Sequence, residues 1–142
     1  MVVFHKSCGF IVFKDGDEGR EFLLLRYPAG HWDYVKGHVE NDEDELTTAV
    51  RELEEETGIK EIDVIDGFMV TMEYNYRENG EKHEKVVDFF MAKSFESDVV
   101  ISHEHTGFVW LSYEDAMKKL TFDNARDVLI AAEAFLITKG YE

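Results

Sequence analysis

The segment from Asp42 to Thr57 constrains most strongly what this chain can fold into. Its apolar residues recur at the i, i+3, i+4 and i+7 positions of one helical face, at Leu46, Ala49, Val50 and Leu53. Asp42 and Glu45 have the spacing of a capping box, and Gly58 suits the end of a helix. We therefore expect an amphipathic helix over residues 42–57 that packs its apolar face against other elements.

The polar face of this expected helix is strongly acidic. Glu52, Glu55 and Glu56 stand at i, i+3 and i+4, and like charges at this spacing destabilise a helix by about 0.2–0.5 kcal/mol per pair. Glutamates near the C-terminal end also oppose the helix dipole. On this pattern alone two interpretations stay open: a solvated acidic face, or a carboxylate site that binds a divalent cation such as Mg²⁺. Arg51 is placed to orient or neutralise one of the glutamates.

Extended segments lie on both sides of this helix in the sequence. We expect strands at residues 2–13, 21–27, 63–76, 85–95 and 108–111, a short extended piece at 31–35, and helices at 112–120 and from 121 or 122 onward. Asn79-Gly80 predicts a tight turn between two of the strands. The expected buried stripe of the last helix is Val128, Leu129, Ala132, Phe135 and Leu136. Mixed strands and helices indicate a layered α/β or α+β fold, and 142 residues without a repeat or linker fit one domain, 1–142.

The net charge of −16 limits the partners of the chain. So acidic a surface repels nucleic-acid backbones, and no apolar stretch reaches the roughly 18 residues of a membrane span. The N-terminus lacks the apolar core of a signal peptide, and the single Cys8 excludes an internal disulfide. We therefore expect a cytoplasmic protein that binds neither nucleic acid nor membrane. An enzyme of this charge that acts on polyphosphates must place cations close to its carboxylates.

The residues around the acidic helix match a known pattern at every fixed position. They resemble the Nudix box, whose fixed positions fall here on Gly37, Glu43, Arg51, Glu52, Leu53, Glu55, Glu56, Gly58 and Ile59. The resemblance implies an α/β/α sandwich with a mixed sheet, in which this segment forms a loop, a helix and a loop. It also implies metal-dependent hydrolysis of a nucleoside diphosphate linked to another group, with Mg²⁺ or Mn²⁺ as the cofactor.

Three further patches resemble the asymmetrical diadenosine tetraphosphate hydrolases of this family. They are residues 27–40, the run Ile-Ser-His-Glu-His at 101–105, and residues 120–136. In those enzymes the substrate is two nucleosides joined by four phosphates, and water attack at phosphorus gives ATP and AMP. The resemblance therefore predicts an asymmetrical bis(5′-nucleosyl)-tetraphosphatase with a small dinucleoside polyphosphate as its partner.

The resemblance also assigns roles to individual residues. The implied metal ligands are Glu52, Glu55, Glu56 and Glu104. The expected catalytic set is Glu52, Glu56, Lys36 and Arg51, with Glu52 a candidate for the general base. The expected substrate contacts are Tyr27, His31, Lys36, Gly37, Tyr76, Lys85 and Phe122. In this interpretation the two lysines contact phosphates, His31 lies near the phosphate chain, and the aromatic residues border adenine or ribose.

The chain departs from these relatives at three places. Val35 replaces a common proline, Asn41-Asp42 replaces Pro-Gly, and Asp88 stands where some relatives carry a second basic residue. Asp88 is expected to weaken the attraction for phosphates. His103 and His105 flank Glu104 in a way that suggests zinc, but the lack of a cysteine cluster disfavours this.

Other hypotheses therefore stay beside the first. One is a Nudix hydrolase for ADP-ribose or a nucleoside triphosphate, and another is a Nudix-fold binding module without catalysis. The intact box glutamates disfavour the binding module. The oligomeric state is left open, with a monomer favoured.

Overall fold

The computed structural model describes residues 1–141, which are built around a mixed sheet of eight strands. The strands are β1 (Val2–Gly16), β2 (Gly19–Arg26), β3 (Trp32–Asp33), β4 (Val35–His38), β5 (Ile62–Val64), β6 (Val70–Glu78), β7 (Glu81–Ser94) and β8 (Gly107–Leu111). β1 and β7 pair in parallel over twelve positions, from Val2 opposite Lys82 to Phe13 opposite Lys93. The other strand pairs are antiparallel. The helices are α1 (Glu45–Thr57), α2 (Tyr113–Lys119) and α3 (Asp123–Thr138).

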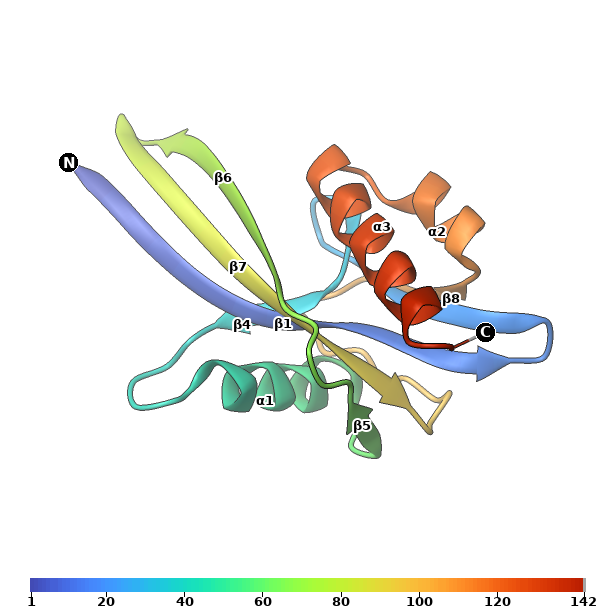
Figure 1. Ribbon diagram of the computed structural model, residues 1–142. Coiled ribbons are helices and arrows are strands. Elements are labelled where there is room, and N and C mark those ends of the chain that lie inside the picture. The colour runs from blue at the N-terminus through green and yellow to red at the C-terminus, as the bar shows by residue number, and fades with distance from the viewer. Residues whose placement is uncertain (142) are drawn as a thin grey trace.

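The helices cover the two faces of the sheet, as Figure 1 shows, with α2 and α3 on one side and α1 on the other. Strand β1 contributes to both cores because successive side chains point to opposite faces. Ile11 and Phe13 pack in the core beneath α2 and α3, whereas Phe10 and Val12 pack in the core against α1. This arrangement confirms the expected α/β/α sandwich with a mixed sheet.

Helix α1 is shorter than the sequence predicts, and the face that it buries against the sheet is partly different. Its N-cap is Asp44, whose carboxylate accepts a hydrogen bond from the Thr47 amide, while Asp42 lies outside the helix with a φ of 67°. The capping box on Asp42 is therefore wrong. The expected stop is confirmed, because Gly58 adopts a left-handed φ of 76° and its amide bonds to the Glu54 carbonyl.

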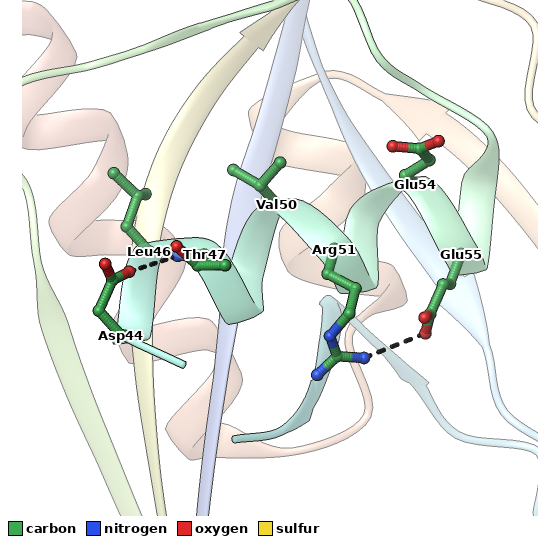
Figure 2. Close-up of a pocket in the computed structure, with 7 residues that line it drawn as sticks. All are labelled: Asp44, Leu46, Thr47, Val50, Arg51, Glu54 and Glu55. Atoms are coloured by element: carbon green, nitrogen blue, oxygen red, sulfur yellow. Dashed lines mark hydrogen bonds and ion pairs between the residues drawn. The ribbon is translucent and has the colours of Figure 1, made fainter. Parts of the chain in front are cut away.

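The buried face of α1 is only partly the predicted one. Ala49 and Leu53 are fully buried, but Leu46 and Val50 are 38% and 40% exposed and lie on the outer side of the helix (Figure 2). The helix instead turns Glu56 inward beside Leu53. The acidic face and the apolar face of α1 therefore overlap. The sequence pattern predicted two separate faces, one polar and one apolar.

The remaining elements follow the sequence in order and type, but β1 extends to Gly16 and β7 begins at Glu81, beyond the expected bounds 2–13 and 85–95. Two expected segments are divided. The expected strand 63–76 is divided into β5 and β6 by a turn in which Gly67 has a φ of 89°, and the piece 31–35 is divided into β3 and β4. The Asn79-Gly80 turn is confirmed, and Ser112, where the helix 112–120 was expected to start, is the N-cap of α2. α3 buries the expected stripe, with Phe135 partly buried. Within residues 1–141 no helix has the length and apolar character needed to cross a membrane.

Candidate active site

Two glutamates of α1 lie at the sheet with their carboxylates largely removed from water. The Glu56 side chain is 4% exposed and the Glu52 side chain is 12% exposed. Glu56 Oε1 lies 2.9 Å from Nε2 of His105, which follows β7 in the loop that leads to β8. Since His105 is 49 positions away in the sequence, the fold alone brings this pair together.

Burial raises the pKa of both carboxyl groups. The pKa of Glu56 rises to about 7, mainly from burial, with hydrogen bonding from the Lys36 backbone opposing the rise. The pKa of Glu52 rises to about 8, again mainly from burial and then from its hydrogen bond and repulsion with Glu56. Burial also lowers the pKa of His105, so its imidazole is neutral near pH 7. Two carboxyl groups therefore exchange protons in the neutral range, where a general base is most effective.

Arg51, on the exposed side of α1, forms hydrogen bonds to three carboxylates of the box segment. Its guanidinium bonds both carboxylate oxygens of Glu43 at 2.7 and 2.9 Å, Oε1 of Glu52 at 2.8 Å and Oε2 of Glu55 at 3.2 Å. Figure 2 shows it reaching toward Glu55 along the helix. Hydrogen bonding to Arg51 lowers the pKa of Glu43 to about 2. Arg51 thus positions the loop before the helix against the carboxylate of Glu52.

Gly37 is required by the position of Glu52. A Cβ at residue 37 would lie 2.0 Å from Cδ of Glu52 and 2.3 Å from each of its carboxylate oxygens. The resemblance implied that Gly37 contacts the substrate, whereas in the structure its close neighbour is the carboxylate of Glu52. Only a residue without a side chain lets strand β4 and Glu52 occupy this space together.

A pair of glycine substitutions tests this reading of Gly37. Gly37→Ala is expected to lower kcat at least tenfold, because the methyl group displaces the Glu52 carboxylate, with a small change in melting temperature. Gly9→Ala provides the contrast of a clash with backbone, since its Cβ would meet the Val35 carbonyl oxygen at 2.0 Å and Cα of Lys36 at 2.9 Å in the β1–β4 pair. That backbone clash is expected to cost stability, about 1–3 kcal/mol. Melting curves and steady-state kinetics separate the two effects, and an active Gly37→Ala enzyme would contradict the assignment.

A cavity of about 340 Å³ lies on the face of the sheet that carries α2 and α3. It is lined by His31, Asp33, Lys36, Met72, Tyr74, Phe122 and Asn124. Lys36 lines this cavity, and its backbone also acts on Glu56, where it lowers the pKa of the carboxyl group. Its size is within the roughly 300–1,000 Å³ of small-molecule sites.

Aromatic rings run from this cavity to the carboxylates. Phe122 lies 5.4 Å from His31, which stacks on Tyr27 at 4.7 Å with 7° between the rings. The edge of Tyr27 meets His105, the partner of Glu56, at 4.6 Å. The Tyr27 hydroxyl donates to the Tyr34 carbonyl at 2.6 Å, so this ring is held in place. The structure therefore brings three predicted substrate residues together beside the catalytic set.

Two lysine ammonium groups lie at or beside this cavity. The sequence analysis expected such cations, because a chain of net charge −16 that acts on polyphosphates must place positive charge near its carboxylates. The Lys36 ammonium bonds Asp33 at 2.9 Å and lies 4.8 Å above the Tyr27 ring. Lys85 pairs with Tyr74 across β6 and β7, with its ammonium 5.8 Å from that ring. Burial and then the charge of Lys36 lower the pKa of Lys85. The two ammonium groups therefore lie close enough for their charges to interact, although Asp33 already pairs with Lys36.

Two predicted site residues lie farther out. Tyr76 does not line the cavity; it stacks on His83 at 4.8 Å, two positions along β6 from Tyr74. Glu104 is exposed in the loop before His105, and its charge contributes to the raised pKa of Glu56. The cavity is also lined by four residues that the sequence did not predict: Asp33, Met72, Tyr74 and Asn124. The alternation of β6 offered a signal for Tyr74, which shares a face with Tyr76.

The expected effect of Asp88 on phosphates is wrong. Asp88 is 4% exposed and faces α1, where it bonds the Lys6 ammonium and accepts from Thr71 at 2.6 Å. Lys85 and the cavity lie on the opposite face of β7. Lys6 also lies 3.3 Å from Glu45, so the nearby group of Cys8, Glu45 and Asp88 already holds a cation, the lysine ammonium.

The donor set at α1 fits a hard divalent cation. Carboxylate oxygens of Glu52 and Glu56 are the ligands that Mg²⁺ and Mn²⁺ prefer. Their raised pKa values show that the fold leaves the negative charges undercompensated. The buried Nδ1 of His105 has no hydrogen-bond partner among the described residues, so one polar atom at this end of the site is left for a ligand or water. Glu55 and Glu104 are exposed nearby.

The sandwich fold and the loop–helix–loop with its buried glutamates define a Nudix domain. The model of the NUDIX domain matches residues 4–132, and the chain belongs to the Nudix family. Nudix hydrolases generally require a divalent metal ion. The chain is 34% identical to the bis(5′-nucleosyl)-tetraphosphatase [asymmetrical] of Rattus norvegicus, over 92% of this chain and 95% of the relative.

Solved structures agree with this placement. The Ap4A hydrolase of C. elegans in a binary complex superposes with a TM-score of 0.84 and 32% identity, covering 94% of this chain and 98% of that one. The NUDIX domain of Shewanella oneidensis NrtR, solved with ADP ribose, has a TM-score of 0.72 at 20% identity over 94% of this chain and 89% of that one. The second likeness shows the fold alone.

Proposed function

We propose that this Nudix hydrolase cleaves dinucleoside tetraphosphates asymmetrically, converting diadenosine tetraphosphate and water to ATP and AMP. The observation that carries the proposal is the cavity of about 340 Å³, lined by aromatic rings and a lysine and joined through Lys36 to Glu56. The similarity to rat and C. elegans proteins named as asymmetrical tetraphosphatases supports this substrate.

The cavity and the lysines suit the two chemically different parts of such a substrate. Phe122 and His31 border one adenine or its ribose, with Tyr27 held behind His31. This places His31 at the base rather than near the phosphate chain, where the resemblance put it. Stacking of a base on aromatic rings is worth about 1–3 kcal/mol. The ammonium groups of Lys36 and Lys85 bind the phosphate chain. Because Lys36 belongs to both regions, it fixes the reacting phosphorus relative to the glutamates.

The carboxyl groups then handle the proton of the attacking water. Glu52 is the candidate general base: its carboxylate takes the proton as the water oxygen bonds to phosphorus. The bond from that phosphorus to the bridging oxygen breaks, and the bridging oxygen leaves with the second nucleotide. A bound divalent ion supplies charge neutralisation on the phosphate oxygens and a lower pKa for water. Arg51 keeps Glu52 oriented throughout.

The proposal includes finer assignments. The metal ion is Mg²⁺ or Mn²⁺, held by Glu52 and Glu56 with Glu55 and Glu104 as further ligands. Gly37 and Tyr76 belong to the substrate side, with Tyr76 reached by the more distant part of a long substrate. We further propose that residues 1–142 act as one domain, as a monomer in the cytoplasm, without nucleic-acid or membrane partners.

A product assay on a nucleotide panel tests the proposed function. The purified protein is incubated with diadenosine tetraphosphate, ADP-ribose and ATP, each with Mg²⁺ and with EDTA. We expect the highest kcat/KM for diadenosine tetraphosphate, with ATP and AMP formed in equal amounts and no turnover in EDTA. Two ADP molecules would exclude the asymmetrical cut. Ribose 5-phosphate and AMP from ADP-ribose as the fastest reaction would replace the tetraphosphate by that substrate.

A further inference from the structure

The carboxylate of Asp33 lies in the wall of the cavity, beside the lysine that the proposed hydrolysis uses. Its Oδ2 is 2.9 Å from Nζ of Lys36, and its Oδ1 accepts a hydrogen bond from the Tyr34 amide at 2.8 Å. The side chain of Asp33 is 6% exposed and that of Lys36 is 8% exposed. Among the described residues that line the cavity, Asp33 is the one acidic residue. The ammonium group that is to bind phosphate therefore already has a counterion from the protein.

The charge of Asp33 also reaches other groups around the cavity. Burial lowers the pKa of Lys85 and of His31, and the negative charge of Asp33 opposes this lowering at both. Burial raises the pKa of Tyr74, and the charge of Asp33 adds to the rise. Tyr74 lines the cavity and is the register partner of Lys85. One carboxylate thus reduces the positive potential at both lysines.

A carboxylate in this position weakens the attraction for phosphate. Asp33 and Lys36 carry opposite charges, so the pair adds no net positive charge to the cavity wall of a chain whose net charge is −16. Lys36 without this partner would attract phosphate more strongly. Holding the ammonium group in place does not require a charged partner, because the oxygen of an amide or a hydroxyl also accepts a hydrogen bond from it. The charge of Asp33 is therefore the feature that calls for a function.

Phosphates differ in charge according to their place in a nucleotide. An internal phosphate, linked on both sides, carries one negative charge. A terminal phosphate has a second pKa near 6 and carries about −1.5 to −2 at pH 7. Repulsion by a nearby carboxylate grows with the charge of the phosphate, and burial strengthens it by lowering the effective dielectric constant. Asp33 therefore disfavours a terminal phosphate at Lys36 up to about twice as strongly as an internal one.

We propose that Asp33 is a specificity-determining residue, which makes the site select the internal phosphates of a dinucleoside polyphosphate over the terminal phosphate of a nucleoside triphosphate. This inference rests on the proposed function, because it assigns Lys36 to the phosphate chain. It gives the substrate two requirements: a nucleoside in the cavity, and a phosphate chain that is closed at its far end by a second nucleoside. Asp33 acts through the charge that it places beside Lys36 and takes no part in the attack of water.

Binding of ATP and of diadenosine tetraphosphate in EDTA tests the proposal without turnover. Calorimetry gives both Kd values for the wild type, for Asp33→Asn and Asp33→Ser, which lack the charge, and for Asp33→Glu, which keeps it. We expect the two uncharged variants to bind ATP at least tenfold more tightly and diadenosine tetraphosphate at most threefold more tightly. Asp33→Glu is expected to keep the wild-type preference. Asp88→Asn is the matched control, because it removes the carboxylate of an Asp–Lys pair on the other face of the sheet, and both Kd values should stay unchanged.

A measurement on the unaltered protein removes any dependence on how the variants fold. The γ-methyl ester of ATP lacks the second charge of the terminal phosphate, so the wild type is expected to bind it at least threefold more tightly than ATP. In Asp33→Asn this difference should become smaller.

Several results would overturn the proposal. Weaker binding of both nucleotides to Asp33→Asn would show that Asp33 only holds Lys36 in place, and equal tightening would show that it does not distinguish the two kinds of phosphate. An ester that the wild type binds no better than ATP, or no measurable binding of either nucleotide to any of the proteins, would count against it equally. A wild type that binds both nucleotides and cleaves neither would refute the proposed function and leave this test of Asp33 intact.

Discussion

Glu56→Gln is expected to lower kcat/KM for diadenosine tetraphosphate at least a hundredfold, which corresponds to about 2.7 kcal/mol in transition-state stabilisation. The amide has nearly the volume of the carboxyl group and can still hydrogen-bond to His105, so the packing at the end of α1 is retained. It cannot carry the negative charge that a divalent cation requires. We expect the loss mainly in kcat, measured by product formation at saturating Mg²⁺.

Stability separates this effect from simple damage to the fold. The neutral amide avoids the cost of holding a charge in a side chain that is only 4% exposed, so Glu56→Gln is expected to melt at or above the wild-type temperature in EDTA. Glu54→Gln is the matched control on the same helix. Glu54 lies on the outer side (Figure 2), its carboxylate 3.7 Å from the Lys60 ammonium, and the variant should keep its activity within twofold. Wild-type turnover by Glu56→Gln would refute the assignment of Glu56.

The local features of this fold could be predicted from the sequence because they depend on residues close together in the chain. The spacing of α1, its stop at Gly58 and the Asn79-Gly80 turn each follow from backbone preferences. The start of α1 was misplaced by two residues because Asp42 and Asp44 are both good caps, and only the left-handed φ of Asp42 decides between them.

The candidate site could be predicted only where a motif encodes it. The box and its flanks indicated Glu52, Glu56 and Lys36, but the partner of Glu56 comes from a loop 49 residues away. The orientation of a helix against a sheet decides which face is buried, and periodicity alone assigned Leu46 to the core where the structure turns it outward. Asp88 shows the same limit, because its effect on phosphates depends on which face of β7 it occupies.

In the absence of divalent metal, the free energy of unfolding is expected to fall as the pH rises from about 6.5 to 8.5. In the metal-free fold the pKa of Glu56 is about 7 and that of Glu52 about 8, both raised from 4.5. In this range the folded state binds more protons than the unfolded state, so the free energy of unfolding falls with increasing pH. Integrated over both groups, the loss is on the order of 3 kcal/mol, or roughly 5–10 °C in melting temperature.

Other titrating groups do not reproduce this slope. Burial lowers the pKa of His105, which makes stability increase with pH, but mainly below the ordinary histidine value of 6.5. Glu43, with a pKa of about 2, loses its contribution only in more acidic solution. Melting curves in EDTA across the range therefore report chiefly on the two buried glutamates.

The origin of the slope is tested by neutralising each glutamate and by restoring the metal. The double variant Glu52→Gln/Glu56→Gln is expected to flatten the EDTA profile, whereas Glu54→Gln should leave it unchanged. Millimolar Mg²⁺ should raise the melting temperature of the wild type most at the alkaline end, because both carboxylates must lose their protons to bind the ion. A wild-type profile in EDTA that is flat or rises toward pH 8.5 would mean that these glutamates are ionised without cost. The metal would then be unnecessary to explain why the fold keeps them buried.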